Sequence, residues 1–196
     1  MQYFKSSLLV LAASLIAFSP NADAKKDKDG GSDLVCPATT EATGIQQIDD
    51  YFGKLDDMNA TIGDVKAALD NVNNKLIGIS GLGEGAGMDA AVDGIRSKIE
   101  GGDSSMKGSL NEVKTGAQEV VEKAKALSDL VPQAQELVTG VAAATKGVDA
   151  KELMAQAGTV KNNTKALKTT VQCLTSIPND AAALVGTVKD LTGGGE

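Results

Sequence analysis

The two cysteines are the residues of this chain whose chemistry follows most directly from their type and number. Cys36 and Cys173 are the only thiols. They do not form the C-x-x-C spacing that is usual for a redox-active pair. An even pair in an exported protein usually forms a structural disulfide. We therefore predict a Cys36–Cys173 bond, with two independent free thiols as the alternative.

Acidic side chains are the next candidates, because carboxylates can chelate cations. Several are expected on the outer face of one helix: Asp49, Asp50, Asp56, Asp57, Asp64 and Asp70. Such a face is more typical of a solvated helix surface than of a metal site. The string DKDGGSD begins like a calcium loop at Asp27, but Ser32 and Ala38 stand where that loop requires Gly and Glu. We expect no metal and no cofactor.

A glycine-rich segment, GISGLGEGAG at Gly78–Gly87, superficially resembles a phosphate-binding loop. No strand is expected before it, no Gly-Lys-Ser/Thr follows it, and the G-x-G-x-x-G order is absent. The segment therefore predicts a flexible connection between helices. A partner-binding tip is the alternative.

The composition argues against catalysis and against nucleic acid. Histidine and tryptophan are absent, so the commonest general base and transition-metal ligand are missing. The formal net charge of −7 disfavours binding to phosphates or to anionic lipid. Beyond the first 24 residues only Tyr51 and Phe52 are aromatic, so base-stacking surfaces cannot be built. We expect a protein that is not an enzyme.

Long helices must position all these residues. Between residues 48 and 79 ten apolar residues follow an alternating spacing of three and four, which places them on one stripe of a helix. They are Ile48, Tyr51, Leu55, Met58, Ile62, Val65, Leu69, Val72, Leu76 and Ile79. A helix with such a stripe is not stable alone in water, so the rest of the chain is expected to cover it.

The same pattern returns twice further along the chain. One series comprises Met106, Leu110, Val113, Ala117, Val120, Ala124, Leu127 and Val131, and the other comprises Leu153, Ala157, Val160, Thr164, Leu167, Val171 and Leu174. The alanines of the first series predict a close approach to a neighbouring helix. The expected helices run from Thr40 or Glu41 to Ile79, from Met88 to Ile99, from Met106 to Gly147, from a cap at Asp149 to Pro178, and through a short helix that carries Leu184.

These elements predict an all-α fold, an elongated antiparallel helical bundle with coiled-coil-like heptad seams. Pro132 decides its topology. A turn there gives an up-down four-helix bundle, and a kink gives a three-helix rod in which Cys36 and Cys173 are roughly 35 Å or more apart. The disulfide favours the four-helix form, although the apolar spacing continues through Pro132.

The chain opens with a pattern typical of an export signal. Lys5 precedes an apolar run, and Ala22-Asp23-Ala24 forms a cleavage site. We predict a signal peptide at 1–24, a disordered leader at 25–39, a helical bundle domain at 40–192 and a flexible tail at 193–196. No transmembrane segment is expected in the mature chain. The expected location is the periplasm or the secreted fraction.

The sequence favours an exported, non-catalytic helical protein that acts through protein–protein surfaces, in a structural, adaptor or chaperone-like role. The alternative is an amphipathic-helix carrier of lipid or another apolar ligand. Self-association through a seam shared between chains is a further possibility.

Overall fold

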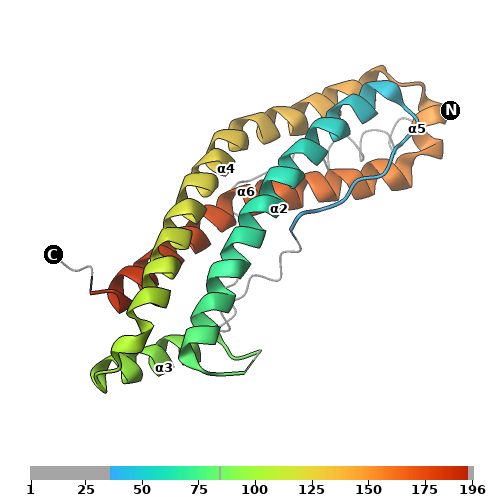
Figure 1. The fold of residues 1–196 in the computed structure, drawn as a ribbon. Coiled ribbons are helices and arrows are strands. Elements are labelled where there is room, and N and C mark those ends of the chain that lie inside the picture. Colours follow the sequence, from blue (N-terminus) through green and yellow to red (C-terminus); the bar gives the residue numbers. More distant parts are fainter. Residues whose placement is uncertain (1–35, 84, 194–196) are drawn as a thin grey trace. The chain divides into compact units, whose positions relative to one another are not determined.

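The structure is a computed structural model that describes residues 36–83 and 85–193. Its elements are α2 (Gln46–Ser80), α3 (Met88–Glu100), the 3-10 helix η1 (Ser104–Met106), α4 (Lys107–Gly147), α5 (Ala150–Ala155) and α6 (Ala157–Leu191) (Figure 1). The described residues contain no strand, and the all-α bundle prediction is confirmed. The predicted signal at 1–24, the leader up to residue 35 and the last three residues of the tail lie outside the described residues, and the domain boundaries stay predictions.

The apolar stripe of the first helix is buried as its spacing predicts. Of its ten members only Tyr51 and Ile79 are half-buried, and the other eight are buried. The largest side chains of the other two series are buried as well, including Val113, Leu127 and Leu167. The seams are therefore the core of the protein.

Proline does not divide the long helices. Pro132 lies inside α4 and Pro178 lies inside α6. The preferred four-helix topology, which required a turn at Pro132, is therefore wrong, as is a helix end at Pro178, and the three long helices of the alternative are present. A proline inside a helix costs about 3 kcal/mol or more. The ring of Pro132 is exposed, so the helix bears the strain on its solvent side while the buried seam continues past it.

The predicted start of the first helix is also wrong, since α2 begins at Gln46 rather than at Thr40 or Glu41. Gly44 has a φ of +76°, which interrupts helical geometry. The carboxylate of Asp49 accepts hydrogen bonds from the backbone N–H groups of Thr43 (2.8 Å) and Gly44 (2.9 Å). This cap fixes the chain in a turn just before the helix.

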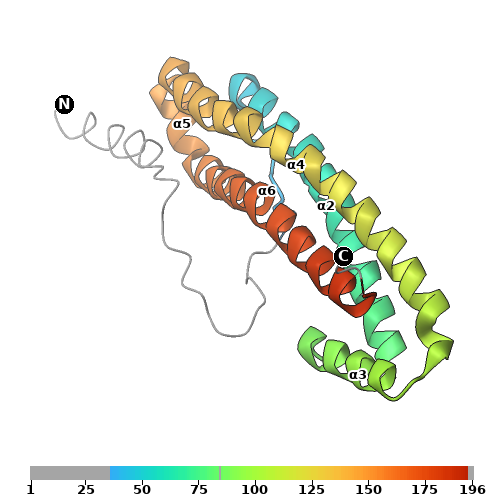
Figure 2. The same cartoon turned by 90° about the vertical axis from the view of Figure 1, so that its left-hand side faces the viewer.

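The other predicted boundaries are close to the observed ones. Gly147 ends α4, and the Asp149 carboxylate accepts hydrogen bonds from the N–H groups of Lys151 (2.9 Å) and Glu152 (3.4 Å) at the start of α5. Asp103 caps η1 in the same way through Ser105. A break at Gln156 between α5 and α6 was not predicted. Figure 2 labels the two helices on either side of it.

The chain forms two compact units, and α2, α4 and α6 contribute residues to both. In its described part, unit 1 comprises residues 36–60 and 130–173, and unit 2 comprises residues 61–83, 85–129 and 174–193.

Glycines mark the close approach of α2 and α4 in each unit. In unit 1, a methyl group on Gly140 would overlap the ring of Tyr51. In unit 2, a methyl group on Gly116 would lie 3.1 Å from Cγ2 of Val72. Glycines therefore permit this close approach, in addition to the alanines that the sequence predicted for this role.

Candidate functional site

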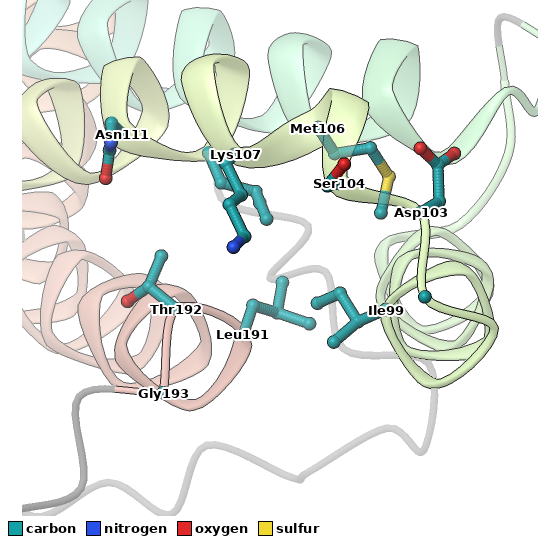
Figure 3. Close-up of a pocket in the computed structure, with 11 residues that line it drawn as sticks. Ile99, Asp103, Ser104, Met106, Lys107, Asn111, Leu191, Thr192 and Gly193 are labelled. Carbon is teal, nitrogen blue, oxygen red and sulfur yellow. The ribbon is translucent and has the colours of Figure 1, made fainter.

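Unit 2 contains a pocket of about 540 Å³ (Figure 3). The end of α3, the segment through η1, the first turns of α4 and the end of α6 line it. Its apolar wall comprises Ile99, Met106, Leu110 and Leu191, and Lys107, Asn111 and Thr192 are among its polar lining residues. Ile99 is 40% exposed, whereas the other three apolar residues are buried.

Local contacts fix the chain around this pocket. The amine of Lys98 donates a hydrogen bond to the carbonyl of Ile79 (3.0 Å), which holds the last turn of α3 against the end of α2. After α3, Gly102 has a φ of +81° and reverses the chain. The Asp103 carboxylate then accepts hydrogen bonds from the N–H (2.9 Å) and the hydroxyl (2.6 Å) of Ser105.

Hydrogen bonds set the electrostatics of Asp103, one of the residues that line the pocket. The hydrogen bonds from Ser105 lower the pKa of Asp103, which makes this carboxylate a weaker base. No imidazole stands beside the hydroxyl of Ser105, because the chain contains no histidine. In Figure 3 the Lys107 side chain extends from α4 toward the end of α6, on the side where Thr192 and Asn111 lie. The pocket is therefore suited to binding an apolar group beside a polar one.

The predicted disulfide is present in unit 1. Cys36 and Cys173 are bonded, with their Cα atoms 6.1 Å apart. Both residues are buried. The bond joins positions that are 137 residues apart in the sequence.

The two cysteines meet without a fourth long helix because residues 36–45, here called the strap, fold back along α2. The side-chain amide of Asn59 donates a hydrogen bond to the carbonyl of Ala38. The hydroxyl of Thr40 donates one to Asp56 (3.0 Å). Asn59 lies about three and a half turns beyond the start of α2, so its contact with Ala38 holds Cys36 far from the terminus of that helix. The strap is the blue segment of Figure 1.

Buried polar side chains on α6 also hold the strap. The Asn163 amide accepts a hydrogen bond from the N–H of Glu41 (3.0 Å) and donates one to the carbonyl of the same residue (2.6 Å). The hydroxyl of Thr170 donates to the side-chain oxygen of Asn59 (2.9 Å). Asn163 is only 2% exposed and Thr170 is fully buried. Sequence reasoning missed these residues.

A signal for them was present in the apolar spacing. Asn163, Leu167, Thr170 and Leu174 follow the alternating three-and-four spacing of a buried stripe. Two polar residues on such a stripe require hydrogen-bond partners, because an unpaired buried polar group is costly. The pattern therefore indicated a buried polar contact, although not its partner.

The other sequence candidates do not come together into a site. Among the described residues, no group of three or more His, Cys, Asp or Glu side chains is placed to hold a metal ion. Asp49 and Asp56 instead accept hydrogen bonds from the strap. The glycine-rich segment connects α2 and α3 as predicted, with positive φ angles at Gly81 and Gly85.

Comparison of the chain with protein-family models, with curated proteins and with solved structures finds no match. No helix in the described part of the chain combines the length and the apolar character needed to cross a membrane.

Proposed function

We propose that this protein is an exported, non-catalytic helical protein that acts through protein–protein surfaces, and that the pocket in unit 2 is its contact with a protein partner. The observation that carries the proposal is the composition of this pocket. An apolar wall with a partly exposed Ile99 stands beside Lys107. Such a site can receive an apolar side chain of a partner and a polar group next to it.

Burial of the seams supports a local contact rather than a seam shared between chains. The apolar stripes of the long helices pack inside the protein. Among the described residues the large apolar side chains that remain exposed are Leu82, Ile99 and Met154. Of these only Ile99 lines the pocket. The pocket is therefore the part of the described surface best suited to apolar contact with a partner.

Export rests on the pattern of the first 24 residues, and the disulfide agrees with it. Structural disulfides persist in the periplasm and outside the cell, where the redox environment is oxidising. The Cys36–Cys173 bond is compatible with such compartments. We therefore propose that the protein works in the periplasm or in the secreted fraction.

A carrier of lipid or another apolar ligand is the second candidate, and the size of the pocket favours it. A volume of about 540 Å³ lies within the range of small-molecule sites. If the protein is such a carrier, the ligand occupies the pocket, and the apolar stripes of the long helices stay packed against one another.

The test is affinity capture from the native compartment with two matched variants of the mature protein. Ile99→Gln makes the pocket wall polar, and Met154→Gln makes the same kind of change at an exposed position in unit 1. We expect a copurifying protein that is retained by Met154→Gln and lost with Ile99→Gln. A lipid lost in the same pattern supports the carrier instead. Loss with both variants, or with neither, refutes the pocket as the contact.

A further inference from the structure

The side chains that hold the strap recognise an extended backbone rather than particular side chains. Asn59 binds the carbonyl of Ala38, and Asn163 binds both the N–H and the carbonyl of Glu41. The pair of bonds at Glu41 resembles the pairing between two neighbouring strands. Together, Asn59, Asn163 and the supporting Thr170 form what we call the strap site.

The polar groups of the strap site are buried and therefore need hydrogen-bond partners. Asn163 and Thr170 are almost completely buried, and the hydroxyl of Thr170 orients the Asn59 amide. A buried amide without its partner is unfavourable. An empty strap site therefore favours any extended segment that can supply the same backbone groups.

The strap itself is separable from the helices. Most of its side chains are exposed or half-buried, and only Cys36, Thr43 and Ile45 are buried. Gly44, with a φ of +76°, lies at the α2 end of the strap, and a hinge there requires release of the hydrogen bonds that Asp49 accepts from Thr43 and Gly44. The covalent bond to Cys173 is thus a principal anchor of the strap's far end.

We propose that the strap site also accepts the strap of a second copy of this chain. The result is a strap-exchanged dimer in which Cys36 of each copy is bonded to Cys173 of the other. A second copy fits because it carries the same backbone pattern and a cysteine at the same distance from it. Exchange of an identical element between protomers requires no new contact surface.

Thiol–disulfide exchange supplies a balanced route to this dimer. A glutathione thiolate attacks the Cys36 sulfur, which forms a Cys36–glutathione disulfide and releases the Cys173 thiolate. The Cys173 thiolate of one copy then attacks the Cys36 sulfur of another copy, forms the intermolecular bond and expels the glutathione thiolate. Glutathione is regenerated, so no net oxidation or reduction occurs.

Two complementary full-chain variants test the proposal. A Cys36→Ser chain keeps only the Cys173 thiol on α6, and a Cys173→Ser chain keeps only the Cys36 thiol on the strap. The two are mixed with reduced and oxidised glutathione, and the oxidised form takes up the two electrons released when a new disulfide forms. We expect a covalent heterodimer whose digest contains a Cys36–Cys173 peptide pair. The strap of the Cys36→Ser chain competes from within its own chain, but the covalent bond lets the exchanged form accumulate.

A backbone substitution in the donor strap shows whether the strap site recognises it. Glu41→Pro in the Cys173→Ser chain removes the N–H that donates to Asn163 and leaves the receiving chain unchanged. Thr39→Pro is the matched control at an exposed strap position. We expect Glu41→Pro to lower the yield of heterodimer about tenfold, the effect of one lost hydrogen bond of this kind, and Thr39→Pro to leave it unchanged. Circular dichroism of each chain confirms that its helices are intact.

Two results overturn the proposal. One is the formation of glutathione adducts without a Cys36–Cys173 heterodimer. The other is a heterodimer whose yield is the same with Glu41→Pro and with Thr39→Pro, because such a bond would form without recognition of the backbone.

Discussion

Gly140 offers a sharp test of how closely α2 and α4 pack in unit 1. A methyl group at Gly140 would lie 2.8 Å from Cδ1 and 2.9 Å from Cζ of Tyr51, and closer still to Cε1. Carbon atoms that are not bonded to each other essentially never come this close. Gly140→Ala therefore forces the Tyr51 ring or the helix to move. The surroundings of Gly53, also in unit 1, leave open space for the same methyl group.

Two opposing effects set the magnitude. Alanine is more favourable than glycine inside a helix by about 0.5–1 kcal/mol. Overpacking of a well-filled interface costs about 1–3 kcal/mol. Gly53→Ala should therefore stabilise by about 0.5–1 kcal/mol, because only the first effect operates. Gly140→Ala should destabilise by up to about 2 kcal/mol, because the overlap outweighs the gain in helix propensity.

Thermal and urea unfolding of the two variants measure this difference. For a chain of this size about 1 kcal/mol shifts the Tm by about 2–4 °C, so the two variants should move it in opposite directions. Tyr51→Ala removes the ring, and in that background Gly140→Ala should lose its penalty, which a double-mutant cycle detects. If Gly140→Ala raises the Tm as Gly53→Ala does, the conclusion that α2 and α4 pack closely at Gly140 is refuted.

Three further predictions concern the core, the disulfide and a helix cap. Ile62→Asp places a charge at a fully buried position and should cost more than about 4 kcal/mol, whereas Asp57→Ala should be nearly neutral; equal melting temperatures would contradict the heptad register. Reduction of the Cys36–Cys173 bond removes a loop constraint worth up to about 5 kcal/mol in the chain-entropy model. It should therefore lower the Tm markedly, and the double Cys→Ser variant should match the reduced protein; an unchanged Tm would contradict this. The pKa of Asp103 is lowered in the folded state, so its contribution is present above the ordinary aspartate pKa and is lost as the pH falls through the lowered value. Asp103→Ala should accordingly lower the Tm at pH 7 but not at pH values below that range, and a difference independent of pH would refute this account.

Periodicity predicted the core because burial on a helix repeats with the helical period. The positions of Ile48, Leu55 and Ile62 follow from spacing alone, and all three are fully buried. The turn predicted at Pro132 was wrong because the Cys36–Cys173 bond was expected to need a fourth long helix, whereas the strap brings Cys36 to Cys173. At Pro132 the seam was the stronger determinant, as the unbroken spacing through that residue already indicated.

Neither candidate site could be predicted from spacing, because each depends on contacts between segments distant in sequence. The partners Glu41 and Asn163 are separated by 122 residues. The strap has no periodic pattern, so nothing in its sequence indicates which helix it follows. The pocket likewise requires the end of α6 to lie beside the start of α4, which brings Leu191 close to Leu110. Only the topology, which the assumed turn at Pro132 had obscured, brings these residues together.

The two proposals can fail independently because their residues belong to different units. Every residue that lines the pocket is in unit 2, and every residue of the strap and the strap site is in unit 1. Ile99→Gln should therefore abolish partner binding while the complementary cysteine variants still form the heterodimer. Glu41→Pro should lower the yield of the exchanged dimer while partner binding persists. If one substitution abolished both activities, the partner captured by this protein would be a second copy of itself, and partner binding and strap exchange would be a single process.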